Sequence, residues 1–296
     1  MTARRIVAPL ALASVLVGVT ACGGSSQAGT DDAASSSAAG DSNQLTITTK
    51  GMAYAITGHP HPGNIDITFD NADDAAHEAQ IVRLADGKTV KDLLADMQEG
   101  GEQAAAGDLA GNPEEMTYGT PSLLYGGEKT EVVSDTIDAG NYAVLCFLPG
   151  PDGMPHVAMG MAAGFTVAGD EVTSTPHSAG TVSLADDGIT VPDGFGSGTY
   201  EVTNTGTAPH SFSVASLDGS LDDLFSYIGG QFAQNEPIDG GPGSLVAGVA
   251  TLKPGQSAWL VLDLPAGHYG YVSTVQGEDP SDTDYARGLH GEFSVS

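Results

Sequence analysis

The chain has 296 residues, with 38 acidic and 9 basic side chains and a formal net charge of −29 at pH 7. A protein this acidic offers no basic footprint to nucleic acid or to anionic lipid headgroups, so we exclude both as partners. The 41 glycines, together with short segments rich in Val, Thr, Ile and Phe, predict an all-β protein with many turns.

The N-terminus has the features of an export signal. Arg4 and Arg5 precede an apolar run that ends near Val19, and small residues lead from there to Cys22. This order is typical of a signal peptide, and the run is too short for a membrane span. A cysteine directly after the small residues resembles a bacterial lipobox, which implies cleavage before Cys22 and lipid attachment to its sulfur. We expect a lipoprotein signal peptide over 1–21.

Residues 22–44 are rich in Ser, Ala, Gly and Asp and have almost no large apolar side chain. Such a stretch cannot bury enough surface to fold, so we predict a flexible tether that begins at the acylated Cys22. Two acyl chains would anchor the mature chain to the outer face of the bacterial cell membrane. The alternative is an ordinary signal peptide in which Cys22 is incidental; it keeps the tether and loses the anchor.

The rest of the chain contains one pattern twice. Three residues fall at identical offsets in the two copies: Asn71, His77 and Leu84 in the first, and Asn204, His210 and Leu217 in the second. Each copy continues with an Asp-Gly turn and a short helical pattern, and each approaches its end with a Gly-x-Tyr sequence. We therefore predict two related domains, over 45–170 and 180–296.

Alternation with a period of two predicts short strands in both copies. In the first copy the expected strands are Leu45–Thr49, Asn64–Phe69, Glu78–Leu84, Glu131–Ile137, Tyr142–Leu148 and Gly164–Val167. In the second they are Thr181–Val191, Thr199–Val202, Ser211–Leu217, Ser257–Leu264, Tyr269–Ser273 and Glu292–Val295. Apolar stripes predict helices over Val90–Met97 and Leu221–Ile228, each followed by an irregular Gly-rich stretch. The pattern predicts two tandem β-sandwiches.

The candidate site lies in the first copy. Cys146 is the one thiol beyond Cys22, and His156 and Met161 follow it as Cys-x9-His-x4-Met, with His77 far upstream. A soft thiolate, two imidazoles and a weak thioether are the ligand set that selects copper at an electron-transfer site. A lone extracytoplasmic thiol has no disulfide partner, so Cys146 must be buried or metal-bound. We predict one copper ion bound by His77, Cys146, His156 and Met161.

Two alternatives concern these residues. Cys146 could instead be a small core residue, since its neighbours are apolar and strand-like. Met159 competes with Met161 as the thioether ligand, and the spacing from His156 favours Met161. We expect Met154 to pack within the loop.

The second copy differs where the chemistry would occur. The positions that correspond to Cys146, His156 and Met161 hold Ser273, Asp284 and Leu289. A hydroxyl and a carboxylate do not make a soft copper site. We expect the second copy to be free of metal and to serve as a structural or docking unit.

The order His77, Cys146, His156, Met161 resembles that of the cupredoxin (blue-copper) family. In that family one His lies on an early strand, while the Cys, the second His and the Met come from the last two strands and their connecting loop. The resemblance covers roughly Leu45 to Ala168, and weakly the second copy. It implies Greek-key β-sandwiches and a type 1-like copper site. Bacterial secreted lipoproteins are also similar around HEAQIVRL and CFLPGPDGMPHVAMGM.

Two features depart from the family pattern. Nine residues separate Cys146 from His156, a spacing longer than in small blue-copper proteins and nearer that of the type 1 site in copper nitrite reductases. The residue after the first His is often Asn in the family, where it ties the two ligand loops together. Here that residue is Glu78.

The resemblance implies single-electron transfer with a redox partner protein rather than enzymatic turnover. A multicopper oxidase would need several His-x-His pairs and a His on each side of the Cys; this chain has the pair at His59 and His61, and neither neighbour of Cys146 is a histidine. Two further functions remain open. One is extracytoplasmic copper binding and delivery to an acceptor protein, and the other is a metal-free β-sandwich binding module.

Overall fold

The computed structural model describes residues 43–105, 108, 119–277 and 282–296. Cys22, the expected signal peptide and nearly all of the expected tether lie outside the described residues. Within the described ranges, no helix is both long enough and apolar enough to cross a membrane.

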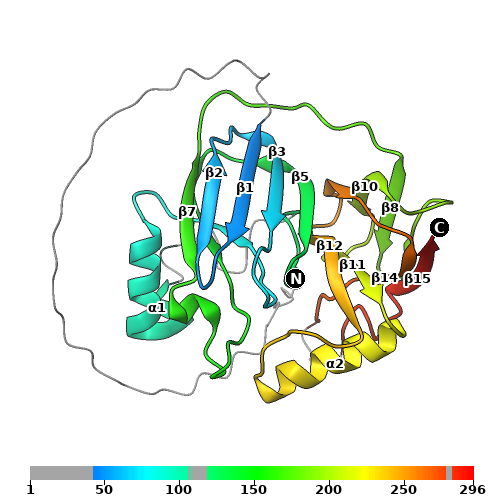
Figure 1. Ribbon diagram of the computed structural model, residues 1–296. Helices are drawn as coiled ribbons and strands as arrows, with labels where there is room; N and C mark the ends of the chain where they lie inside the picture. The colour runs from blue at the N-terminus through cyan, green and yellow to red at the C-terminus, as the bar shows by residue number, and fades with distance from the viewer. Residues whose placement is uncertain (1–42, 106–107, 109–118, 278–281) are drawn as a thin grey trace.

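Strands are the main regular elements of the structure (Figure 1). In the first repeat they are β1 Gln44–Thr49, β2 Tyr54–Gly58, β3 Gly63–Asp70, β4 Gln80–Arg83, β5 Lys129–Ile137, β6 Gly140–Leu145 and β7 Ala162–Val167, with helix α1 Val90–Ala105. In the second repeat they are β8 Gly180–Ala185, β9 Gly188–Thr190, β10 Gly198–Asn204, β11 His210–Leu217, β12 Gly243–Leu252, β13 Ser257–Leu262, β14 Gly267–Val272 and β15 His290–Val295, with helix α2 Leu221–Gln234. The predicted all-β sandwich fold is confirmed.

One eight-stranded sheet runs through both repeats in the order β2-β1-β3-β5-β13-β10-β8-β9. Strands β5 and β13 pair antiparallel at its centre, where Val133 lies opposite Trp259. The two halves of this sheet have the same internal order, and the pairs β1-β3 and β8-β10 are both parallel. Two smaller sheets, β4-β6-β7 and β12-β11-β14-β15, complete the sandwiches. The two copies of the sequence pattern thus form the same strand order.

A segment of the first repeat, residues 119–125, joins the two smaller sheets. On one side, the Ser122 N–H donates to the carbonyl of Gly248 in β12, at 3.1 Å. On the other side, Leu124 and His77 exchange two backbone hydrogen bonds of 2.9 and 3.0 Å. The repeats are therefore connected through both layers, and His77 lies at one of the connections.

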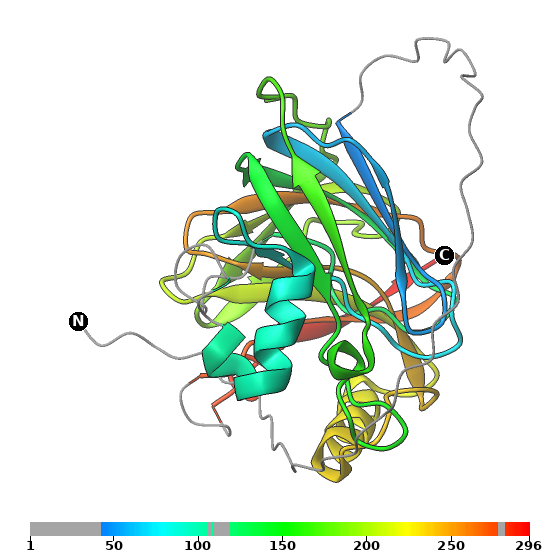
Figure 2. The same ribbon diagram turned by 90° about the vertical axis from the view of Figure 1, so that its left-hand side faces the viewer.

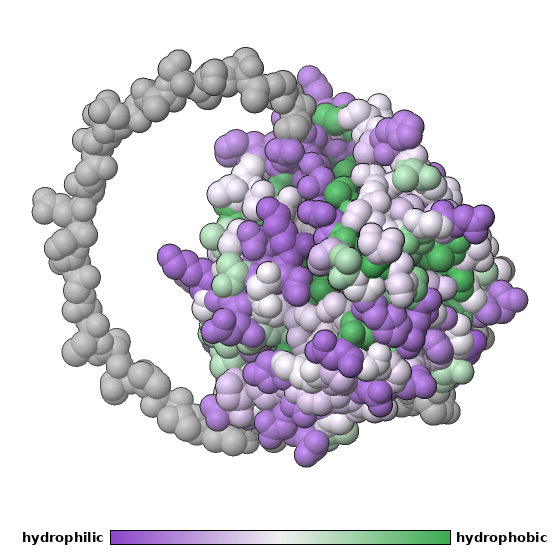
Figure 3. Space-filling view, turned by 45° about the vertical axis from the view of Figure 1, so that its right-hand side comes forward, coloured by the Kyte–Doolittle hydropathy of each residue, from purple (hydrophilic) through white to green (hydrophobic). Residues whose placement is uncertain are grey.

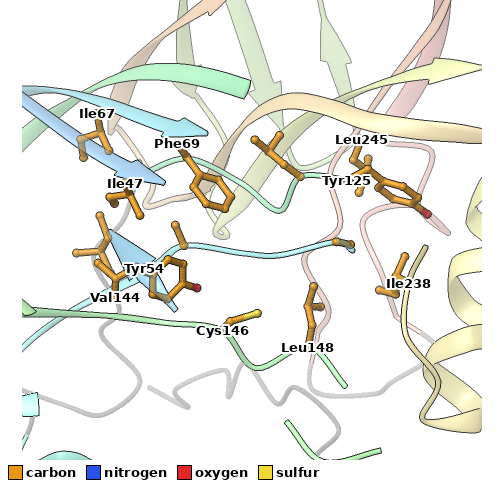
Figure 4. Packing of buried hydrophobic residues seen from close by; sticks show 14 of the residues in the cluster. Ile47, Tyr54, Ile67, Phe69, Tyr125, Val144, Cys146, Leu148, Ile238 and Leu245 are labelled. Atoms are coloured by element: carbon orange, nitrogen blue, oxygen red, sulfur yellow. The ribbon is translucent and has the colours of Figure 1, made fainter. Parts of the chain in front are cut away.

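The main core contains buried side chains from both repeats (Figure 4). Ile47 and Phe69 from the eight-stranded sheet share this core with Cys146, and Leu217 and Leu245 join from the second repeat. Full burial of an aliphatic or aromatic side chain of this size contributes about 1.5–3 kcal/mol. The interior around Cys146 is thus built by the two repeats together.

The sequence does not predict β12, which forms where an irregular Gly-rich stretch is expected. Gly248 explains the difference, because β12 lies between β11 and residues 119–125. A Cβ at Gly248 would come within 2.4 Å of the Ser122 hydroxyl oxygen and 2.6 Å of the Phe212 carbonyl oxygen. The glycine therefore permits close approach of neighbouring chains, rather than breaking the strand.

Two other elements also differ from expectation. The single strand predicted over Thr181–Val191 is wrong, because Asp186 and Asp187 form a turn between β8 and β9. Strand β2 is not predicted at all, and it supplies Tyr54 to the core.

The two helices lie at the periphery of the molecule (Figure 2), and few large apolar side chains of the described residues are exposed. Figure 2 shows α1 on the outside of the first repeat and α2 at the end of the molecule that the loop after β6 approaches. The face in Figure 3 carries mostly hydrophilic side chains with scattered apolar ones. Across the described residues, the large apolar side chains that are exposed are Met52, Met154, Met159 and Phe232. Two of these lie in the loop after β6.

Candidate metal centre

Three of the predicted ligands come together in the structure. His77 lies three residues before the start of β4, Cys146 directly follows the end of β6, and His156 begins a 3₁₀ turn. The Cys146 Sγ lies 3.9 Å from Nδ1 of His77 and 3.3 Å from Nδ1 of His156. All three side chains are buried, and their ligand atoms lie within 4.8 Å of one another. In the part of the chain that the structure describes, no other group of three or more His, Cys, Asp or Glu side chains meets this spacing.

The ligand loop, residues 146–161, brings its two ends together through backbone hydrogen bonds. The His156 N–H donates to the Leu148 carbonyl at 3.0 Å, and the Val157 N–H donates to the Cys146 carbonyl at 2.7 Å. Between them the chain turns back on itself, with Pro149 paired to Pro155. The long spacing between Cys146 and His156 therefore forms a small hairpin and does not separate the ligands.

The methionines of this loop differ in burial. Met161 is fully buried in the same core as Cys146, whereas Met159 is 36% exposed. Burial favours Met161 as the thioether ligand, and that assignment stays a prediction. Met154 is 49% exposed, which does not fit the expected packing within the loop.

The carboxylate of Asp73 lies beside the imidazole of His77. Its Oδ2 lies 3.4 Å from Nε2 of His77, and its Oδ1 accepts a hydrogen bond from the Gly51 N–H at 2.8 Å. A carboxylate beside Nε2 favours the tautomer with its proton on that nitrogen, which leaves the Nδ1 lone pair on the side of Cys146. Sequence reasoning missed Asp73, since a carboxylate four residues before a His is common on any acidic surface.

The asparagine that both repeats share holds the loop before each histidine. Asn71 is fully buried, and its amide donates to the carbonyls of Ala75 and Leu124 at 2.9 and 3.1 Å. Asn204 makes the equivalent bond to Ala208 at 2.8 Å. The common offset between Asn and His in the two repeats was the signal for this role, which is structural and independent of the metal ligands.

Glu78 ties the two ligand segments together. Its Oε1 accepts a hydrogen bond from the N–H of Phe147, the residue after Cys146, at 2.7 Å, and its Oε2 accepts one from the Gln80 amide at 3.1 Å. Burial raises the pKa of Glu78, and these two hydrogen bonds oppose the rise. The carboxylate thus links the segment that holds His77 to the segment that holds Cys146.

The environment of Cys146 keeps its thiol protonated when no metal is bound. Burial, and to a lesser extent the Glu78 carboxylate, raises the pKa of Cys146 to about 12. Hydrogen bonds from the backbone at Glu78 and Leu148 act in the opposite direction. The Tyr54 hydroxyl donates to the Glu78 carbonyl, and Figure 4 shows this hydroxyl on the side that faces Cys146. A coordinating cation is the group that would stabilise the thiolate here.

Both histidines are neutral at neutral pH, as metal ligation requires. Burial, assisted by the nearby charge of His77, lowers the pKa of His156 to about 4. Burial also lowers the pKa of His77, against the opposing effect of Asp73. A thiol, two neutral imidazoles and a buried thioether in one apolar interior fit copper by donor type.

The corresponding residues of the second repeat bond to one another. Nδ1 of His210 lies 2.7 Å from Oδ2 of Asp284, and the Ser273 hydroxyl donates to the same oxygen at 2.5 Å. All three are fully buried. On the other side of the ring, Nε2 of His210 lies 3.1 Å from Oδ1 of Asp186. Arg287 also forms an ion pair with Asp284. A hydrogen-bonded charge network occupies the place of the ligand set, and the expected lack of metal there stays a prediction.

Comparison with known proteins gives likeness to copper proteins at low similarity. No family model matches the chain, and no curated protein does. Dithionite-reduced auracyanin from Roseiflexus castenholzii is 21% identical, with a TM-score of 0.28. The match covers 40% of this chain and 95% of the auracyanin chain. Auracyanin B is 18% identical, with a TM-score of 0.26, covering 42% and 93%. Copper nitrite reductase from Nitrosomonas europaea is 11% identical, with a TM-score of 0.22, covering 86% and 93%. Likeness at this level assigns neither a family nor an activity by itself.

Proposed function

We propose that this chain is a membrane-anchored, extracytoplasmic copper protein that transfers single electrons. The buried group of His77, Cys146 and His156 is the observation that carries the proposal. Bound copper would supply the one-electron Cu(I)/Cu(II) couple. The three side chains would hold it with Met161, and lipid on Cys22 would keep the protein at the membrane.

The residues around the ligands suit this role because they restrain the site and exclude water. Asp73 lies beside His77, Glu78 links the two ligand segments, and the shared core buries Cys146 completely. A ligand set held by packing and hydrogen bonds changes little between two oxidation states, which favours fast electron transfer over ligand exchange.

A copper titration of residues 44–296, followed by visible absorption and EPR, tests the proposal. We expect an intense thiolate-to-copper band at one copper per chain, and we expect Cys146→Ser to abolish it. His177→Ala removes an exposed histidine between the repeats and serves as the matched control, which should keep the band. Colourless copper binding that persists in Cys146→Ser would contradict the proposal.

A second candidate, copper delivery, is supported by the exposed thioethers of Met154 and Met159 on the ligand loop. Soft thioethers at the surface could pass Cu(I) to or from the buried ligands. Delivery predicts exchange of copper with a Cu(I) chelator that slows when both methionines are changed to Leu. An electron carrier predicts slow exchange in both proteins together with reversible reduction.

A further inference from the structure

We propose that the C-terminal end of α2, in the second repeat, clamps the ligand loop of the first repeat and fixes the position of His156. The clamp gives the second repeat a role even though it lacks the soft ligand set. Its consequence for copper rests on the proposed function, while the clamp itself is a property of the metal-free chain.

The polar part of the clamp is one hydrogen bond between the repeats. The Asn235 side-chain amide donates to the Gly153 carbonyl at 2.7 Å. Asn235 caps α2 in the left-handed conformation, with φ 57°, and its N–H bonds back to the last turn of the helix. Among the described residues, it alone has positive φ without being a glycine. The cap holds the side chain that reaches the loop.

Gly153 is matched to this contact from the other side. Its φ is +70°, and a Cβ there would come within 2.2 Å of the Asn235 amide nitrogen. A side chain at this position would thus be strained in its backbone and would also push the loop away from α2. Gly153 permits the close approach on which the hydrogen bond depends.

The apolar part of the clamp lies behind this bond. The chain after α2 folds back on the helix, and the Gln231 amide donates to the Pro237 carbonyl at 2.8 Å. This places Ile238, which is 2% exposed, in the same core as Cys146 and Leu148. Figure 4 shows Ile238 opposite Leu148. The second repeat therefore bonds to the tip of the ligand loop through Asn235 and shares a buried cluster with Leu148 near the base of the loop.

The loop needs such a contact because most of its tip faces solvent. Pro151, Asp152 and Met154 are exposed, and few interactions beyond the loop's own hydrogen bonds order them. Each residue ordered without compensating contacts opposes folding through lost conformational entropy. Without the clamp, the loop would open more often, and His156 would move away from Cys146. Asn235 is thus a positioning residue.

The substitution Asn235→Gly tests the clamp while preserving the helix cap, because glycine adopts the left-handed conformation readily. In the full-length metal-free chain, we expect faster amide hydrogen exchange in the loop and faster alkylation of Cys146, read by mass spectrometry of its own peptide. The expected increase is about three- to tenfold, the effect of one hydrogen bond on a local opening equilibrium. Gly153→Ala, which disturbs the contact and leaves Asn235 in place, should act in the same direction.

Unchanged exchange and alkylation in Asn235→Gly would overturn the clamp, as would faster exchange in α2 with no change in the loop. If both regions exchange faster, the alkylation of Cys146 decides: faster alkylation in Asn235→Gly supports the clamp, and unchanged alkylation overturns it. In copper-loaded protein, Asn235→Gly should also accelerate copper release to a chelator. Failure of the unaltered chain to bind copper would reject the proposed function, while the metal-free readouts would still decide the clamp.

Discussion

At the residue scale, the candidate ligands depend on side chains that are not ligands themselves. Asp73 lies beside Nε2 of His77, Glu78 connects the His77 segment to the Cys146 segment, and Tyr54 lies beside the sulfur. Each of these contacts uses a hydrogen bond or a charge in a buried setting, where an unmatched polar group is destabilising.

Glu78 provides a test at this scale. Replacing it with Ala leaves the partly buried Phe147 N–H without its acceptor, so we expect a loss of about 1–3 kcal/mol in the free energy of unfolding. Glu78→Gln keeps an oxygen acceptor and should lose less. Urea unfolding of the metal-free protein measures both, and Gln80→Ala, which removes the partner of the other oxygen, is the control. Equal losses in the Ala and Gln variants would contradict the linking role.

His210 makes the stability of the second repeat depend on pH. Burial lowers its pKa, but Asp284 and Asp186 raise it more, and the net pKa lies above 6.5. The stability from the charged His210 is therefore fully present below pH 6.5 and is lost as pH rises through the elevated folded pKa. Burial raises the pKa of Asp284, but hydrogen bonds from His210, Ser273 and Arg287 outweigh it, and the net pKa is lowered. Its contribution is present above the unfolded value of 3.8 and is lost as pH falls through the lower folded pKa.

The free energy of unfolding should decline as the pH rises from 6.5 through the raised folded pKa of His210. We expect His210→Gln to make this decline smaller. Unfolding free energies measured from pH 5 to 9 check this, with His268→Gln as a surface control. The prediction fails if both variants keep the slope of the unaltered protein.

At the element scale, β12 and residues 119–125 explain how two sandwiches become one layered structure. The strand interior of β12 contains Gly248, which the packing of Ser122 and Phe212 requires. Hydrogen bonds also determine the shape of the ligand loop. Its length suggests that Cys146 and His156 lie far apart, but the N–H groups of His156 and Val157 close the loop into a hairpin.

Gly248→Ala tests the packing at β12. The added methyl group would meet backbone and side-chain atoms at well below contact distance, so we expect a loss of about 1–3 kcal/mol. Gly229→Ala in helix α2 is a control with the opposite expected effect. A Cβ at Gly229 would meet nothing within 4 Å, and Ala should stabilise the helix by about 0.5–1 kcal/mol. Chemical denaturation measures both; an unchanged Gly248→Ala variant would show that β12 has room to move.

At the scale of the whole molecule, the two repeats share a sheet and a core. We therefore expect one cooperative unfolding transition. Trp259, the single tryptophan, lies on β13 opposite Val133 of β5, so its fluorescence reports on the junction between the repeats. Fluorescence and far-ultraviolet circular dichroism should give coincident transitions. Two separated transitions would mean that the repeats fold as independent domains.

The proposed anchor also belongs to this scale. We expect the expressed full-length chain to fractionate with membranes and Cys22→Ala to release it in soluble form, because the acyl chains supply the attachment. Fractionation followed by mass spectrometry of the N-terminal peptide measures this. A Cys22→Ala protein that stays with membranes would show that another contact holds it there.

Several features were visible in the sequence alone. Strand alternation predicted the all-β sandwich, and the ligand types in the order His77, Cys146, His156 predicted a group that the structure does bring together. These inferences succeed because strand alternation and ligand chemistry are properties of local sequence and residue type. Strand β12 and the turn between β8 and β9 were missed because close packing and turn chemistry override simple alternation.

The tertiary structure alone decided how the site is supported. The contacts of Asp73 with His77, of Glu78 with Phe147 and of Asn235 with Gly153 depend on how separate segments meet in space. The burial of Met161 and the exposure of Met159 likewise follow from packing, since the sequence places both in one short loop. Sequence by itself determined the fold class and the chemistry of the donor set. Tertiary structure decided burial, orientation and the contact between repeats, because those properties arise from residues far apart in the chain.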